Sequence, residues 1–76
     1  MKSIDQKALG RHFAEVRKAH YMTQRQLEEK ADIAKGMVSK YEQGVTLPCL
    51  YNLLLICGAL GITLDEYIGE IPVAEV

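Results

Sequence analysis

The spacing of apolar residues near the start of the chain is typical of an amphipathic helix. Apolar side chains recur at intervals of three and four residues between Leu9 and Val16, which places them on one helical face. Ser3, followed three residues later by Gln6, has the spacing of a capping box, in which two side chains satisfy amides at a helix start. The pattern predicts a first helix from residue 4 or 5 to residue 20.

Residues 23–44 predict two short helices joined by a tight turn. Thr23 and Gln26 form a second capping box, so a helix should run from residue 24 to about residue 30. After a turn at residues 31–33, a third helix is expected over residues 35–43, stopped by Gly44. Its two sides differ, because Ala34, Val38 and Tyr41 share one side, and Lys35, Gly36, Ser39 and Lys40 share the other.

The second half of the chain predicts two further helices. Pro48 suits the first turn of a fourth helix, which should run to about residue 60 and stop at Gly61. Thr63 and Glu66 form a third capping box, so a short last helix is expected over residues 64–68.

The pattern as a whole predicts an all-α protein with one domain, because 76 residues suffice for one small core. A compact five-helix domain is expected over residues 1–69. An extended or frayed tail should follow over residues 70–76, where Ile71 and Val73 could form a short strand.

Charge is distributed unevenly along the chain, although the net charge is only −1. All nine Lys and Arg lie in residues 1–44 with six acidic residues, giving +3, whereas residues 45–76 hold four acidic residues and no base, giving −4. This split is typical of a protein with one nucleic-acid face and another face of different character. Chance clustering in a short chain is the alternative.

Other classes of function find little support in the sequence. The apolar stretch at residues 53–62 is far shorter than the ~20 residues that span a membrane. Residues 1–7 lack the apolar core of a secretory signal, so we expect a cytoplasmic protein. Cys49 and Cys57 should lie ~12 Å apart in one helix, too far for a disulfide. No catalytic constellation is visible, and no metal, cofactor or small-molecule ligand is expected.

A set of motifs follows in fixed order from Leu9 to Ile68. It comprises Gln24, Leu27, Ile33, Val38, Ser39, the Glu42-Gln43-Gly44 end of the third helix, Pro48 and the run from Ala59 to Glu66. Each motif is weak alone, but the ordered set resembles the phage-repressor and Cro-like, or XRE-type, helix-turn-helix family of DNA-binding regulators. The resemblance implies a lambda-repressor-like domain whose second and third helices form the helix-turn-helix.

The resemblance also implies which residues contact DNA. Gln24 would bind a backbone phosphate at the start of the second helix, whereas Lys35, Gly36 and Lys40 would face base edges. A solvated surface residue is the alternative at each position. The full DNA face expected from the resemblance is Thr23, Gln24, Arg25, Lys35, Gly36, Met37, Ser39, Lys40 and Gln43.

Arg17 and Glu42 match positions that form a largely buried ion pair in some members of the family. Such a pair would tie the first helix to the end of the third and orient the reading helix, although desolvation opposes its Coulomb energy. Two solvated charges are the alternative.

Three departures from the family pattern concern the reading helix. Ala34 stands where the family usually has Ser or Thr to cap the third helix, so either Asp32 caps it or the helix starts less firmly. Gly36 should weaken the helix by ~1 kcal/mol relative to alanine. The loop at residues 45–47 lacks the lysines and arginines that many relatives place against phosphate. We therefore expect a poorly anchored reading helix.

The fourth helix is apolar on every side, which indicates burial on every side. In so small a domain the second burial needs another chain, so we expect a homodimer. The stripe expected to cover the core is Leu50, Leu53, Leu54, Cys57 and Leu60. The expected dimer interface is Leu47, Tyr51, Leu55, Tyr67, Ile68 and Ile71.

These patterns favour a sequence-specific transcription regulator, most simply a repressor, that binds double-stranded DNA as a homodimer. Two-fold symmetry would require an inverted-repeat operator with half-sites ~10 bp, or a multiple of that, apart. The alternative is a protein–protein interaction module with a vestigial DNA face. The weak anchoring of the third helix favours that alternative, and the retained Gln24, Lys35 and Lys40 oppose it.

Overall fold

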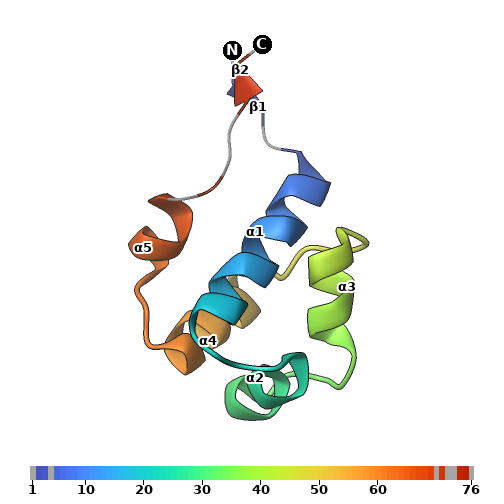
Figure 1. Ribbon diagram of the computed structural model, residues 1–76, viewed down its shortest axis with the longest axis vertical. Coiled ribbons are helices and arrows are strands. Elements are labelled where there is room, and N and C mark those ends of the chain that lie inside the picture. Colours follow the sequence, from blue (N-terminus) through green and yellow to red (C-terminus); the bar gives the residue numbers. More distant parts are fainter. Residues whose placement is uncertain (1, 4, 70, 72–73, 76) are drawn as a thin grey trace.

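A computed structural model of the chain shows a bundle of helices from which the two chain ends project together (Figure 1). It describes residues 2–3, 5–69, 71 and 74–75. Within these residues the predicted all-α, five-helix architecture is confirmed, with α3 and α5 on opposite sides of α1 (Figure 1). The helices are α1 (Gln6–Ala19), α2 (Gln24–Ala31), α3 (Met37–Gln43), α4 (Leu50–Leu60) and α5 (Leu64–Gly69), and the strands are β1 (Lys2–Ser3) and β2 (Ala74–Glu75).

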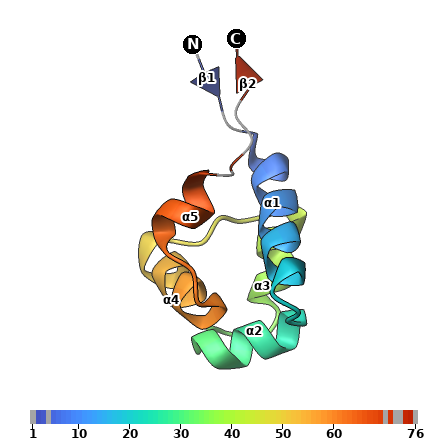
Figure 2. The same cartoon turned by 60° about the vertical axis from the view of Figure 1, so that its left-hand side comes forward.

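The two ends of the chain pair with each other, as Figures 1 and 2 show. β1 and β2 run antiparallel, with Lys2 opposite Glu75 and Ser3 opposite Ala74. The predicted capping box of Ser3 and Gln6 is therefore wrong, because Ser3 belongs to β1 and Asp5 occupies the N-cap position of α1. The tail does contain a strand, but at Ala74–Glu75: Ile71 is not part of it, and Val73 lies outside the described residues.

The start of α1 is tied to the end of α3. The side-chain amide of Gln6 donates a hydrogen bond to the carbonyl oxygen of Gly44 over 2.7 Å. One turn later, a Cβ atom placed on the buried Gly10 would lie 2.5 Å from the carbonyl oxygen of Glu42. Only a residue without a side chain fits at that distance, so Gly10 allows the backbones of α1 and α3 to touch.

Two of the three predicted capping boxes are present. The Thr23 hydroxyl accepts from the amide of Gln26 over 3.1 Å, and the Gln26 side chain accepts from the amide of Thr23 over 2.9 Å. Thr63 and Glu66 make the same reciprocal pair over 3.1 and 3.0 Å. Helices α2 and α5 accordingly begin where the sequence predicts.

Helix α4 begins later than predicted, at Leu50. Cys49 is its N-cap residue, and the Sγ atom accepts from the amide of Asn52 over 3.5 Å. Pro48 therefore precedes the helix and does not lie in its first turn. Cys49 is exposed and Cys57 is buried, and both are free thiols.

The core lies between α1, the helix-turn-helix and α4. Leu27 of α2, Val38 of α3 and Ile56 of α4 are completely buried, and Phe13 and Val16 of α1 cover them. The side of α4 that faces the core differs from the prediction. Leu50 and Leu54 of the expected stripe are 64% and 49% exposed, whereas Ile56 and Ala59, which lie outside that stripe, are buried.

Candidate nucleic-acid interface

The turn between α2 and α3 is longer than the sequence predicts, because α3 begins at Met37 and not at Lys35. Gly36 is the N-cap residue, with φ 87° and ψ −9°, and the amide of Met37 donates to the carbonyl oxygen of Ala34 over 3.2 Å. This geometry is that of a type II turn with glycine in its third position. Lys35 and Gly36 therefore lie at the tip of a turn.

The role expected of Gly36 must be corrected accordingly. Its φ lies in the left-handed region, which a side chain disfavours, and no atom would obstruct an added Cβ within 4 Å. Glycine at this position therefore stabilises the turn and does not weaken the helix.

A buried carboxylate caps the start of α3. Glu28 of α2 is 4% exposed, and its Oε2 atom accepts from the amides of Gly36 and Val38 over 2.9 and 3.1 Å. The predicted cap, Asp32, is wrong: Asp32 ends α2 in a left-handed conformation with φ 58°. The prediction of a loosely started helix is also wrong, because Glu28, eight positions upstream of Gly36, caps α3.

The other end of α3 is held by an ion pair between Arg17 and Glu42. The guanidinium Nε donates to Oε2 over 2.6 Å and Nη2 to Oε1 over 3.1 Å, with both side chains only 10% exposed. Arg17 also donates to the carbonyl oxygen of Met22 over 2.7 Å. Gln24 donates to Oε1 of Glu42 over 2.9 Å. This network joins α1, the start of α2 and α3.

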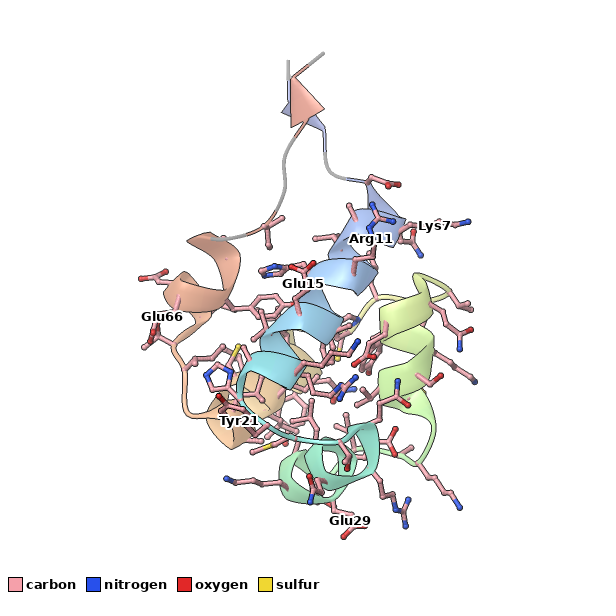
Figure 3. All side chains as sticks on the ribbon, in the orientation of Figure 1. Lys7, Arg11, Glu15, Tyr21, Glu29 and Glu66 are labelled. Atoms are coloured by element: carbon pink, nitrogen blue, oxygen red, sulfur yellow. The ribbon has the colours of Figure 1, made fainter. Side chains whose placement is uncertain are left out.

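The residues expected to contact DNA come from the start of α2, the turn and α3. Thr23, Arg25, Lys35, Gly36, Lys40 and Gln43 are exposed, and Gln24 and Ser39 are half-buried. Arg25 pairs with Glu29, one turn later, over 3.0 Å, and Glu29 points outward from α2 in Figure 3. Gln43 donates to the hydroxyl of Ser39 over 2.8 Å. Met37 packs partly against the core, so only part of its side chain faces outward.

A separate apolar face lies at the start of α4 and around α5. Leu47, Tyr51 and Ile68 of the expected interface are exposed, and Leu50 and Leu54 join them. Leu47, Ile68 and the half-buried Ile71 line an apolar hollow of about 260 Å³ between α1, α4 and α5. We define the apolar face by its exposed residues, namely Leu47, Leu50, Tyr51, Leu54 and Ile68.

Tyr67 was expected in the interface but belongs to the core. Its ring packs edge-on against that of His12, with ring centres 4.8 Å apart, and the carbonyl oxygen of Tyr67 lies 2.9 Å from Nε2 of His12. Burial raises the pKa of the Tyr67 hydroxyl to about 12. Leu55 is half-buried and packs against the core, so it contributes less to an exposed face than predicted.

Comparisons with known proteins place this geometry in context. A family model described as helix-turn-helix matches residues 13–67. The chain is 34% identical over 62 residues to the immunity repressor protein of Bacillus phage phi105, covering 82% of this chain and 43% of that protein. It is 41% identical over 57 residues to the cryptic phage CTXphi transcriptional repressor RstR of Vibrio cholerae, covering 75% of this chain and 51% of that protein.

The chain thus spans about half the length of the curated relatives it matches. Among solved structures, the clp gene regulator ClgR of C. glutamicum superposes with a TM-score of 0.76 at 28% identity, covering 86% of this chain and 84% of that one. No helix in the described residues has the length and apolar character needed to cross a membrane.

Proposed function

The chain belongs to the phage-repressor-like helix-turn-helix family, and from this premise we propose that it binds duplex DNA sequence-specifically and regulates transcription, as a repressor. The observation that carries the proposal is that α3 is held at both ends by buried carboxylates, while Lys35 in the preceding turn and Lys40 in α3 are exposed to solvent. A fixed helix with exposed basic side chains can enter the major groove.

The proposed division of labour among the exposed residues follows from their positions. Thr23, Gln24 and Arg25 surround the start of α2, where backbone amides and side chains can bind phosphate. One Nε2 hydrogen of Gln24 serves Glu42, so the other is left for a phosphate oxygen. The residues proposed to face base edges are Lys35, Gly36, Met37, Ser39, Lys40 and Gln43.

We infer further that a second copy of the chain covers the apolar face. Five exposed large apolar residues on one small domain form a surface that water solvates poorly. Helix α5 lies on the opposite side of α1 from α3 (Figure 1), so pairing through α5 and the start of α4 would leave the reading helices accessible. A two-fold dimer would present its reading helices to half-sites about 34 Å, or ~10 bp, apart in an inverted repeat.

DNA binding is tested by measuring affinity for a random duplex and for operators selected from a random pool, each at 50 and 200 mM salt, concentrations that separate strong from weak phosphate contact. Affinity should fall steeply with salt, and selected sites should contain an inverted repeat. Lys40→Ala should weaken the selected site and blur its sequence preference, whereas Gln24→Ala should weaken all duplexes alike. A dimer without salt-dependent binding would overturn the proposal and favour a protein-interaction module.

Dimerisation is tested by sedimentation. Leu54→Asp and Tyr51→Asp should each give monomers, because a charge would be buried unpaired in the interface. Tyr21→Asp is the matched control, because Tyr21 is also an exposed aromatic residue but lies at the turn between α1 and α2 (Figure 3). Unchanged dimers in the two α4 variants would place the interface elsewhere.

A further inference from the structure

We propose that Glu28 is the positioning residue of the reading helix: it fixes the start of α3 against α2 and thereby determines how well the protein discriminates between DNA sequences. The inference rests on the proposed function and adds a residue that lies outside the expected DNA face.

The start of α3 needs a cap that its own neighbourhood does not supply. The first amides of any helix lack partners within the helix. Ala34, Lys35 and Gly36 precede α3, and none of these side chains carries a hydrogen-bond acceptor. The N-cap residue, Gly36, accordingly makes no side-chain cap bond.

Glu28 satisfies these amides from a neighbouring helix. Its Oε2 atom accepts from Gly36 and Val38, while the intervening amide of Met37 donates to the carbonyl oxygen of Ala34. Three consecutive amides at the start of α3 are therefore satisfied within the protein. These three amides are not available to bind a DNA phosphate, whereas the side chains of Lys35 and Lys40 remain available as donors in this region.

A cap from another helix does more than a local cap. A serine beside α3 would stabilise the helix but would leave its angle to α2 undetermined. Glu28 lies in the interior of α2, next to the completely buried Leu27, so its hydrogen bonds connect the core to the reading helix. Hydrogen bonds to a buried carboxylate are among the stronger ones, because one partner is charged. Together with Glu42 at the far end, Glu28 fixes α3 at two points.

The effect of Glu28 on DNA affinity through positioning can be distinguished from its effect through charge. Removing an acidic residue near a DNA face reduces electrostatic repulsion, so charge alone predicts tighter binding to every duplex. Positioning predicts weaker binding to the selected operator without a matching loss on random DNA. The two explanations therefore predict opposite signs for the operator.

The experiment compares the full chain with Glu28→Ala, Glu28→Gln and the control Glu29→Ala, which removes an exposed charge one residue away. Glu28→Ala should reduce the operator-to-random affinity ratio at least about tenfold, because two charge-assisted bonds are lost. Glu28→Gln keeps an acceptor oxygen and should stay within about threefold of wild type. Glu29→Ala should leave the ratio unchanged.

A rescue variant guards against simple misfolding. Ala34→Ser places a hydroxyl two residues before Gly36, where it can accept from the amide of Gly36, and combined with Glu28→Ala it should recover part of the lost ratio, beyond any effect of Ala34→Ser alone. Equal ratios in Glu28→Ala and wild type would overturn the proposal, and so would a Glu28→Gln variant as defective as Glu28→Ala.

Amide hydrogen exchange in the free protein supplies a readout that needs no DNA. The amides of Gly36 and Val38 should be protected in wild type and Glu28→Gln, and should exchange at least about tenfold faster in Glu28→Ala. Unchanged protection would overturn the role of Glu28 whatever the DNA result. Protected amides in a protein that binds no DNA would instead overturn the proposed function, while showing that Glu28 still fixes α3.

Discussion

Replacing either partner of the Arg17–Glu42 ion pair should destabilise the domain strongly. Both side chains are 10% exposed, and Arg17→Met would leave the carboxylate of Glu42 with Gln24 as its remaining side-chain donor. Removing one partner of a buried pair costs about 3–5 kcal/mol, mostly because the remaining charge stays buried without compensation. A domain of this size has a free energy of unfolding of about 4–11 kcal/mol, so the loss would be a large fraction of the total.

The assay is urea unfolding followed by far-UV circular dichroism. With a slope of about 1 kcal/mol per molar urea for so small a protein, Arg17→Met should lower the midpoint by about 3–5 M. Glu42→Leu should behave similarly. The double variant should cost less than either single one, because no buried charge remains and the two apolar side chains can pack together.

The control is a solvent-exposed ion pair, which also joins an arginine and a glutamate. Arg25 and Glu29 lie 3.0 Å apart with side chains 56% and 66% exposed, so Glu29→Ala should change the free energy of unfolding by less than about 0.5 kcal/mol. The reasoning would be refuted by an Arg17→Met cost below about 1 kcal/mol, or by a double variant whose cost equals the sum of the single costs.

Further predictions concern the backbone and pH. Gly10→Ala should cost about 2 kcal/mol or more in urea unfolding, because the new Cβ would lie 2.5 Å from a backbone carbonyl oxygen that has little room to move. Gly36→Ala should lower the free energy of unfolding by about 1 kcal/mol, because alanine is strained at φ 87°. Asp32→Gly should raise it by about 0.5–1 kcal/mol, because glycine is not strained at φ 58°. A stabilising Gly36→Ala or a destabilising Asp32→Gly would contradict the assigned conformations. Because the folded pKa of Tyr67 is raised from 10.0 to about 12, its contribution to stability is complete below pH 10 and is lost between about pH 10 and 12. Tyrosinate absorbance should show a late-titrating component that is lost in Tyr67→Phe, and identical curves for the two proteins would contradict the burial.

Local signals in the sequence predicted the helices well where the governing interaction is short-range. The capping boxes at Thr23 and Thr63 join residues three positions apart, so both α2 and α5 begin as expected. The same spacing occurs at Ser3 but does not mark a helix start, because Ser3 pairs with Ala74 in the two-stranded sheet. A local pattern predicts structure only when no distant partner competes for the same atoms.

The candidate site was predicted in its residues more than in its geometry. Lys35 and Lys40 are exposed as expected, but Lys35 lies in a turn and Tyr67 in the core. Glu28 was missed because the amides that donate to it lie across a turn whose shape depends on the left-handed conformation of Gly36. Nothing in the spacing of Glu28 and Gly36 indicates that they meet.

The sequence by itself determined the five helices, their order and the presence of a helix-turn-helix, because helix periodicity and caps act over a few residues. Only the tertiary structure decided which side of α4 faces the core, since its apolar residues surround the whole helix and allow several orientations. It also decided how α3 is held, because the atoms that hold both its ends come from other helices. Packing selects among orientations that the local pattern leaves equivalent, and in this protein that selection sets the reading helix and the apolar face.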